Sequence, residues 1–554
     1  MRRADSIIYR RLFLAAAAMA FLRSGSLHFH AIGKFETSAG TSLLFMALRW
    51  VFYTAFFFTV FFVIDRGLHR AAGRENILFE SDEGKVRGCW KDYIVFGISW
   101  LPMLLIKYPS ALCWDTWGMI QQYRGGYITK AQSVFLTVVL GKLIEVFEKR
   151  GIPNMGIFIF SFLNYLLCVA AFGYAMNVLR RMRASFAARS IIFAVIILNP
   201  YILGYIGVII KDLPYAVSVM AVIAALIDID LDCKDFLRSP FRILLLIFMA
   251  ANAILTRGNG LSIMLVLVLT GIVKAIAEKK TLKPVFILAA GCAIGVLTSG
   301  LLSANLDAGD SSRREILSLP FQQTARYVKY YGDEVTDEER EAINGVLDYE
   351  RLGQLYSPRI SDPVKWTYKG DDSKLPAYFK AWAGMFRKHP REYVEATWHQ
   401  NYYLFTPEVQ NVVLYQDEHA GYEMGMEKYV DLREQNFYEP IFKSPEKLQS
   451  LQKEIVRELM LIHDLPIFGL IGNTAFWNML FMATAGFAMA YRLKMKILFA
   501  PLIMTTLFVI FGPVIQGHPR YFFPVVYAMP FVLMAAARKI VDRLRAGQQT
   551  SSGR

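Results

Sequence analysis

The chain has 554 residues, of which 55% are hydrophobic and only 19% are charged, and its mean hydropathy is +0.34. A soluble globular protein carries about 25% charged residues, so this composition excludes a soluble enzyme, an intrinsically disordered chain and a small disulfide scaffold. We therefore expect a polytopic membrane protein.

The charge is unevenly distributed along the chain. The net charge is +15, yet residues 304–465 hold 20 Lys/Arg against 28 Asp/Glu, whereas the remainder holds 41 against 18. Basic residues gathered between apolar stretches are what the orientation of membrane helices requires, so the charge gives no reason to expect nucleic acid as a partner. The five cysteines share no metal-ligand spacing, and none lies between about residues 305 and 465.

Twelve stretches are candidate spans, since a membrane helix needs about 20 mostly apolar residues. They lie at about residues 12–32, 43–64, 91–108, 155–179, 190–210, 213–232, 241–256, 260–276, 284–304, 467–491, 497–515 and 520–537. The first is interrupted by Arg23, His28 and His30 but lacks the cleavage site of a signal peptide, so we expect it to remain as an anchor. The predicted fold is an all-α polytopic membrane protein of about twelve transmembrane helices.

Basic clusters predict the orientation of these spans. The clusters lie near residues 2–11, 66–91, 180–189, 234–242, 274–283, 492–496 and 538–545, and all face the cytoplasm if the stretch Ala131–Phe147 does not cross. That stretch is amphipathic and predicts an interfacial helix. Its polar side holds Lys142, Glu145 and Glu148, and its apolar side holds Phe135, Val138, Val139 and Leu143. Both termini are then cytoplasmic, as suits a multi-pass protein of a bacterial plasma membrane.

The predicted organisation has six parts. They are the N-terminal transmembrane helices 1–108, an external loop with a juxtamembrane amphipathic helix 109–154, central transmembrane helices 155–304, an extracytoplasmic, mainly helical domain 305–465, C-terminal transmembrane helices 466–540 and a cytoplasmic tail 541–554. In the external domain, Thr336 and Glu339 predict a capping box that opens a helix to about Arg351. The aromatic residues there are candidates either for sugar or bilayer contact or for the domain core: Trp382, Trp398, Tyr402, Tyr403 and Phe405.

One acidic residue is a candidate catalytic group. Asp115 follows the predicted third span in the stretch Tyr108-Pro109…Cys113-Trp114-Asp115-Thr116-Trp117. Partial shielding from water raises the pKa of a carboxyl toward that of a general base. The alternative is a structural role, in which Asp115 caps the helix that begins at Thr116.

Three basic residues interrupt apolar segments on the predicted external side. They are Lys211 in Lys211-Asp212, Arg257 in Arg257-Gly258-Asn259-Gly260, and Arg520 in Pro519-Arg520-Tyr521. Charges near membrane depth are costly and tend to be functional. Converging cations could hold the phosphate of an amphiphilic donor. Alternatively each cation snorkels or pairs locally, with Asp212 as the obvious partner of Lys211.

These residues resemble the GT-C superfamily of membrane glycosyltransferases. More narrowly, the chain resembles an uncharacterised bacterial family of polytopic membrane proteins. The resemblance is carried by Tyr108-Pro109, Trp114-Asp115, Gln121, Lys211-Asp212, Arg257-Gly258-Asn259-Gly260, the stretch Leu319–Tyr327 and Arg520-Tyr521.

The resemblance implies an inverting glycosyltransferase that uses a polyprenyl-phosphate sugar donor and an envelope acceptor on the external face. Asp115 would be the catalytic base, and Arg520, Lys211 and Arg257 would bind the donor phosphate. Asp212, Tyr521, Asn259 and Gln121 are further candidates. A phosphate leaving group is stable as an anion, so cationic stabilisation can replace a general acid.

Two positions depart from the pattern of the superfamily. Many relatives carry a second acidic residue beside the loop Asp, whereas Thr116 and Trp117 stand here, which argues against a divalent metal; no cofactor is otherwise implied. Thr129-Lys130-Ala131-Gln132 replaces a His-Pro-Pro-like opening and leaves the acceptor side unassigned.

Two other classes of function remain open. One is a transporter or flippase of lipid-linked saccharides, which a discontinuous helix at Asn199-Pro200 would suit. The other is a non-catalytic envelope protein that binds polyprenyl phosphate.

Overall fold

The computed structural model describes residues 2–34, 40–73, 78–80, 88–309, 312–409, 445–463, 465–512 and 514–552. Over these ranges the chain is almost entirely helical, and its one sheet is a parallel pair of two-residue strands, β1 (Ala111–Leu112) and β2 (Val208–Ile209). The all-α class predicted from the sequence is confirmed.

Seven helical segments within the described residues are long and apolar enough to cross a membrane. They lie in α1 (Arg2–Ile32), α2 (Gly40–Gly73), α6 (Pro153–Arg181), α9 (Asp212–Leu231), α12 (Asn259–Ala277), α13 (Lys283–Asn305) and η6 with α26 (Pro519–Phe522 and Phe523–Ser552). The other five predicted spans correspond to shorter helices: α3 (Lys91–Ile106), α7 (Phe186–Leu198), α11 (Pro240–Thr256), α24 (Thr474–Ala490) and α25 (Lys496–Phe511). These apolar helices indicate a membrane protein.

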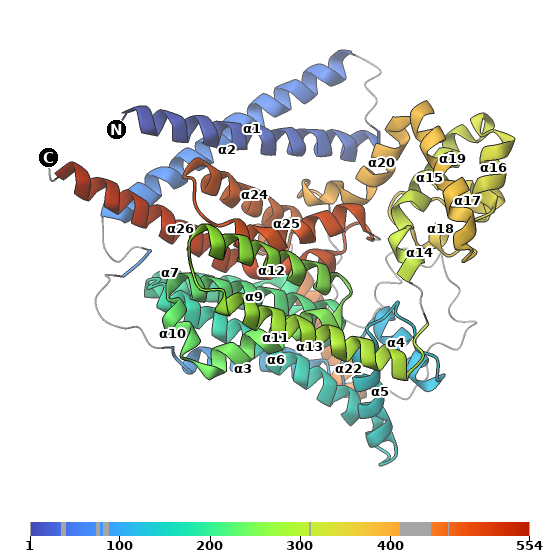
Figure 1. Cartoon of the computed structure of the whole chain (residues 1–554), viewed down its shortest axis with the longest axis horizontal. Coiled ribbons are helices and arrows are strands. Elements are labelled where there is room, and N and C mark those ends of the chain that lie inside the picture. Colours follow the sequence, from blue (N-terminus) through green and yellow to red (C-terminus); the bar gives the residue numbers. More distant parts are fainter. Residues whose placement is uncertain are drawn as a thin grey trace.

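Helix α9 is the central helix of the bundle, because 89% of its most apolar stretch is buried and it packs against α6, α11 and α26 (Figure 1). Its 20 residues span about 30 Å at 1.5 Å per residue, which matches the hydrocarbon thickness of a bilayer. Buried carboxylates stand at both ends of α9, Asp212 at its start and Asp228 near its end.

The predicted span 190–210 is wrong in its second half. Helix α7 ends at Leu198, and the Asn199 side chain accepts a hydrogen bond from Tyr201 N at the start of the short α8 (Pro200–Leu203). Pro200 lacks an N–H and its ring obstructs a continuous helix. The chain from Gly204 to Ile210 is not helical but is buried throughout, which is the condition for irregular backbone at membrane depth.

The predicted amphipathic helix is α5 (Val134–Glu148), which packs on α6 and on α4 (Trp114–Arg124). The Ser133 side chain caps it by accepting from Leu136 N. Its most buried side chains include Val134, Thr137, Leu140 and Ile144, whereas the four predicted apolar residues, Phe135, Val138, Val139 and Leu143, are half-buried. The buried face is therefore rotated from the predicted one, because α5 packs against protein on more than one side.

A separate helical domain follows α13. It comprises α14 (Ser312–Ile316), α15 (Ser318–Tyr331), η1 (Gly332–Glu334), α16 (Asp337–Asn344), α17 (Tyr349–Leu355), α18 (Asp362–Lys365), η2 (Asp372–Lys374), α19 (Leu375–Lys388) and α20 (Pro390–Asn401). Its own core includes Phe321, Tyr327, Ile343, Tyr378 and Met385. The domain lies at the end of the bundle opposite the two chain termini, the same end as α4 and α5 (Figure 1). We call these the domain end and the termini end.

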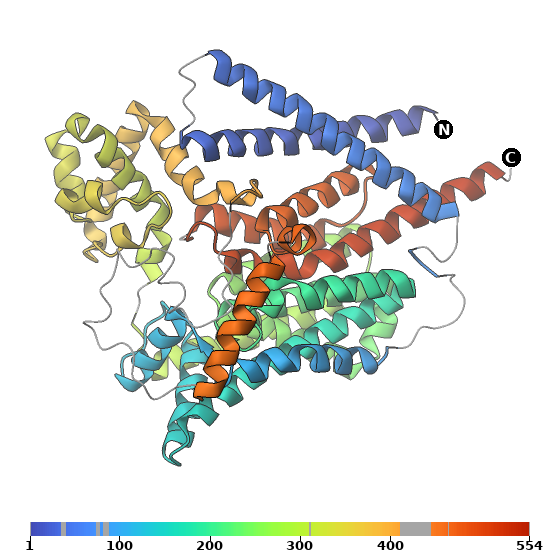
Figure 2. The ribbon, with the colours of Figure 1, turned by 180° about the vertical axis from the view of Figure 1, so that it is seen from behind.

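The capping box at Thr336 and Glu339 is confirmed, but its helix stops at Asn344, because Gly345 ends it and α17 starts separately. After α20 and η3 (Tyr402–Leu404), Tyr403 and Phe405 lie in the core of the bundle. Helix α22 (Glu446–His463) crosses the back of the bundle, where Gln452 donates to the Ile106 carbonyl at the end of α3 (Figure 2). The remaining short helices are α10 (Cys233–Leu237) and α23 (Pro466–Ile471).

Candidate functional site

The two-residue sheet positions Asp115. After α3, Ser110 Oγ donates to Gly207 O over 2.8 Å, and Ala111 N donates to the same carbonyl over 2.9 Å. Strands β1 and β2 then pair in parallel, and Thr116 Oγ1 at the start of α4 donates to Ile209 O. Because β2 ends two residues before Lys211, this pairing brings Asp115 and Lys211 together at the domain end.

Four side chains from separate segments form one polar network, which we call the Asp115 cluster: Asp115, Gln132, Lys211 and Arg520. Arg520 Nη1 lies 3.1 Å from Asp115 Oδ2, and Lys211 Nζ lies 3.7 Å from the same oxygen. Gln132 Nε2 donates to Asp115 Oδ1 over 3.0 Å, while its Oε1 accepts from Lys211 Nζ over 2.8 Å. The carboxylate is thus held by two cations and one amide.

A second ion pair adjoins the cluster. Arg257 pairs with Asp212, and its guanidinium lies 5.4 Å from the centre of the Tyr521 ring. Arg520 Nη2 donates to the Tyr521 hydroxyl over 3.3 Å, so Tyr521 links the two sets of charges. The alternative of a local pair between Lys211 and Asp212 is not what the structure shows. Consecutive residues at a helix start point about 100° apart, and the two side chains take different partners.

The cluster is only partly shielded from water, with 18% of the Asp115 side chain, 17% of Lys211 and 11% of Arg520 exposed. Burial by itself raises the pKa of Asp115, but Lys211 and Arg520 outweigh it, so this pKa lies below its ordinary value. The sequence-based expectation of a raised pKa for Asp115 is therefore wrong. Burial lowers the pKa of the Lys211 ammonium, and Asp115 opposes that effect.

Among the described residues, no hydrogen bond or ion pair joins two of the sequence candidates, Gln121 and Asn259, to the Asp115 cluster. Gln121 lies six residues further along α4, about 240° around the helix, so its side chain leaves from another face. Asn259 begins α12 beside Arg257. Gln132 was missed as a site residue, although it ends the Thr129–Gln132 stretch that departs from the superfamily pattern. Its only other signal was its place at the start of the predicted amphipathic stretch Ala131–Phe147.

The segment before Arg520 joins the cluster to the helical domain. Gln516 N donates to Arg359 O over 2.9 Å, and Gln516 Nε2 donates to His399 O over 2.5 Å. His518 is buried beside these residues. Because Arg520 contacts Asp115, residues 516–520 lie against both the helical domain and the segment that carries Asp115.

The residues around Asp115 do not fit a divalent metal. The single carboxylate of the cluster is contacted by two cationic side chains, which would repel a metal ion. Within the described residues, no group of three or more His, Cys, Asp or Glu side chains could hold a metal ion.

Gly260, in the Arg257–Gly260 turn, allows α11 and α12 to approach closely. A Cβ on Gly260 would overlap the Ala253 carbonyl oxygen, whereas a Cβ on Gly258 would meet nothing within 4 Å. We expect Gly260→Ala to destabilise the protein by about 1–3 kcal/mol, the usual cost of overpacking. Gly258→Ala is the matched control. Thermal unfolding in detergent checks both, and equal melting temperatures for the two variants would contradict this role of Gly260.

The fold and the cluster define an all-α membrane protein with a partly buried charged site at one end of its bundle. A family model described as a family of unknown function, DUF6020, matches residues 94–550, and the chain belongs to that family. No curated protein and no solved structure matches the chain. Helices α1 and α2 precede the matched region.

Proposed function

We propose that this protein is a membrane glycosyltransferase that transfers a sugar from a polyprenyl-phosphate-linked donor to an envelope acceptor. One observation carries the proposal: Asp115, Lys211 and Arg520, far apart in the sequence, meet within 3.7 Å at one end of an apolar helix bundle. A lipid-linked donor needs its reactive phosphate to meet protein cations at the membrane boundary, while its chain stays in the bilayer.

The cluster supplies the two groups that inverting transfer requires. The acceptor hydroxyl oxygen attacks the anomeric carbon and Asp115 takes its proton. The bond between that carbon and the phosphate oxygen breaks, and the electron pair leaves on the phosphate. Lys211 and Arg520, with Arg257 beside them, stabilise the released anion. Tyr521 orients the Arg520 guanidinium.

Donor binding would also activate the base. In the free protein Lys211 and Arg520 hold the pKa of Asp115 low, which makes it a weak base. A donor phosphate that takes over these cations removes the counter-ions of Asp115 and adds a nearby negative charge. Both changes raise the pKa of a carboxyl. The base would therefore become effective only when the donor is present.

The proposed topology has twelve spans, with both termini in the cytoplasm and the helical domain 305–465 outside a bacterial plasma membrane. The seven candidate spans, the four shorter apolar helices α7, α11, α24 and α25, and helix α3 support this count. The basic loops of the sequence support the orientation, because Lys and Arg are enriched in cytoplasmic loops. The cluster would then face the extracytoplasmic side, beneath the helical domain.

A transporter or flippase of lipid-linked saccharide is the second candidate. The buried, non-helical stretch from Gly204 to Ile210 favours it, because broken helices line the substrate sites of many transporters. Movement of a labelled lipid across proteoliposomes without a new glycosidic bond would favour transport. A polyprenyl-phosphate-binding protein without catalysis would bind donor but leave Asp115 dispensable.

Donor binding tests the phosphate role of Lys211 and Arg520. We expect a short-chain polyprenyl phosphate, but not the matching polyprenol, to raise the melting temperature of the purified protein. Lys211→Gln and Arg520→Gln should each weaken this binding about 10–100-fold, since a hydrogen bond to a charged group contributes about 1.5–3 kcal/mol. Lys380→Gln, which removes an exposed cation from the helical domain, is the control. Equal stabilisation by polyprenol and polyprenyl phosphate would contradict the proposal.

A further inference from the structure

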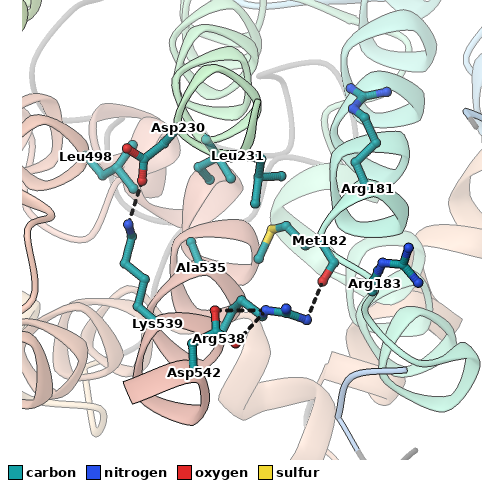
Figure 3. Close-up of a pocket in the computed structure, with 11 residues that line it drawn as sticks. Arg181, Met182, Arg183, Asp230, Leu231, Leu498, Ala535, Arg538, Lys539 and Asp542 are labelled. Carbon is teal, nitrogen blue, oxygen red and sulfur yellow. Dashed lines mark hydrogen bonds and ion pairs between the residues drawn. The ribbon is translucent and has the colours of Figure 1, made fainter. Parts of the chain in front are cut away.

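A second charged site lies at the termini end. A cavity of about 310 Å³ is enclosed by the turn after α6, the last turn of α9, the start of α25 and the second half of α26 (Figure 3). This volume falls in the range of small-molecule sites, about 300–1,000 Å³. Because the cavity adjoins the last turn of α9 and the Asp115 cluster adjoins its first, the two are separated by about 30 Å of helix.

The lining of this cavity, which we call the Asp230 pocket, is positively charged. Its charged lining residues are four cations and two carboxylates: Arg181, Arg183, Arg538, Lys539, Asp230 and Asp542. The Asp230 carboxylate is contacted by three ammonium groups. Its oxygens lie 2.5 Å from Lys539 Nζ, 2.6 Å from Lys274 Nζ and 3.8 Å from Lys280 Nζ. Positive charge therefore exceeds negative charge in the pocket, and an anion would be attracted to it.

The lining is also partly apolar. Ile227 and Leu498 are buried on its wall, and Leu231 at the end of α9 is 42% exposed. The pocket thus combines cations with an apolar side that reaches the surface of the bundle. Basic pockets between membrane helices bind the phosphate head groups of anionic lipids.

Arg183 occupies a backbone position that its residue type disfavours. It has φ +58° and stands at the C′ position of a Schellman motif, in which Arg183 N donates to Arg180 O and Ala184 N donates to Leu179 O. Glycine or asparagine is the usual residue there, because a Cβ is strained in the left-handed region. Lys279 and Arg492, which lie outside the pocket lining, occupy the same left-handed position after α12 and α24. The backbone position alone therefore does not mark Arg183 as a ligand-binding residue, and its part in the pocket rests on its place in the lining.

We propose that the Asp230 pocket binds the phosphate ester of an anionic membrane lipid in the leaflet at the termini end. The cations contact the phosphate, and the acyl chains leave past Leu231 toward the bilayer. This site is independent of the Asp115 cluster and of the sugar-transfer proposal.

Titration of the full-length protein in detergent with short-chain phosphatidic acid tests the proposal, with diacylglycerol of the same chain length and inorganic phosphate as separate arms. We expect phosphatidic acid to bind, diacylglycerol not to bind, and inorganic phosphate to bind at least tenfold more weakly. Inorganic phosphate that binds as tightly as phosphatidic acid would overturn the lipid assignment and leave a site for a soluble phosphate ester.

Variants separate ligand binding from folding. Arg183→Asn should weaken phosphatidic acid binding about tenfold or more while keeping or raising the melting temperature, because asparagine tolerates the left-handed backbone. Lys539→Gln should weaken binding to a similar extent. Lys494→Gln removes a side chain that is 79% exposed and lies outside the pocket lining, and should bind as the wild type does. Wild-type affinity in Arg183→Asn and Lys539→Gln would overturn the proposal.

Discussion

Asp115→Asn is expected to lower sugar transfer by about 10²–10⁴-fold, the usual contribution of a positioned general base, without loss of the fold. Asparagine matches aspartate in size and keeps an oxygen for Gln132, but it cannot take the acceptor proton. The substitution also removes the negative charge that pairs with Lys211 and Arg520 in the free protein. Donor phosphate should therefore bind as tightly as before or more tightly, so that kcat falls while KM for the donor does not rise.

The measurement is transfer of labelled sugar by the purified protein in proteoliposomes, together with donor binding by thermal shift. Glu148→Gln is the matched control, since Glu148 lies at the same end on α5 and pairs with Arg124 at the surface. It should leave transfer unchanged. Full activity of Asp115→Asn would show that Asp115 is not the catalytic base. Loss of donor binding together with loss of transfer would indicate a structural role for Asp115 instead.

Arg326→Leu is expected to have the largest effect on stability, about 3–5 kcal/mol, because it breaks a buried ion pair and leaves charges without partners. Arg326 Nε lies 2.8 Å from Glu392 Oε2, its Nη2 pairs with Glu395, and its Nη1 donates to the Tyr356 hydroxyl over 3.2 Å. The three charged side chains are at most 8% exposed. The network joins α15 to α20 and so holds the helical domain together.

Arg391→Leu is the control for this prediction. Arg391 contacts the other oxygen of Glu395, with its Nε 2.7 Å from Oε1, but 41% of its side chain is exposed. The Arg391→Leu substitution removes a half-exposed cation and leaves Glu395 paired with Arg326, so this variant should lose clearly less stability than Arg326→Leu. Thermal unfolding and protease resistance of the domain in the full-length protein check both variants. Similar losses in the two would show that burial does not set the strength of the network.

Arg326 belongs to a stretch that the family resemblance singles out. The stretch Leu319–Tyr327 carries part of the family resemblance, but the sequence assigns no role to its polar residues. In the structure Gln322, Gln323 and Arg326 are buried in α15, where they bond to neighbouring segments of the helical domain. From the sequence, a polar residue that organises a domain core looks the same as one that meets a ligand, because both are polar residues in a helical pattern.

The sequence by itself determined the all-α class, the positions of the apolar helices and the charged residues that are candidates for a functional site. These properties depend on local composition: a long apolar run favours a membrane helix, although the stretch from Gly204 to Ile210 is an exception, and a charge in such a run is visible without a structure. The positions of Asp115, Lys211 and Arg520 at the ends of apolar segments followed from the same reasoning.

Only the tertiary structure decided which charges meet. Lys211 pairs with Asp115 and not with its neighbour Asp212, which pairs with Arg257. Gln132 hydrogen-bonds to both Lys211 and Asp115. The direction of the Asp115 pKa shift also depended on it, since the pairing of β1 with β2 brings Asp115 and Lys211 together from positions about a hundred residues apart. Partner choice between side chains is set by distances of a few ångströms between segments remote in the chain, and no local pattern encodes those distances.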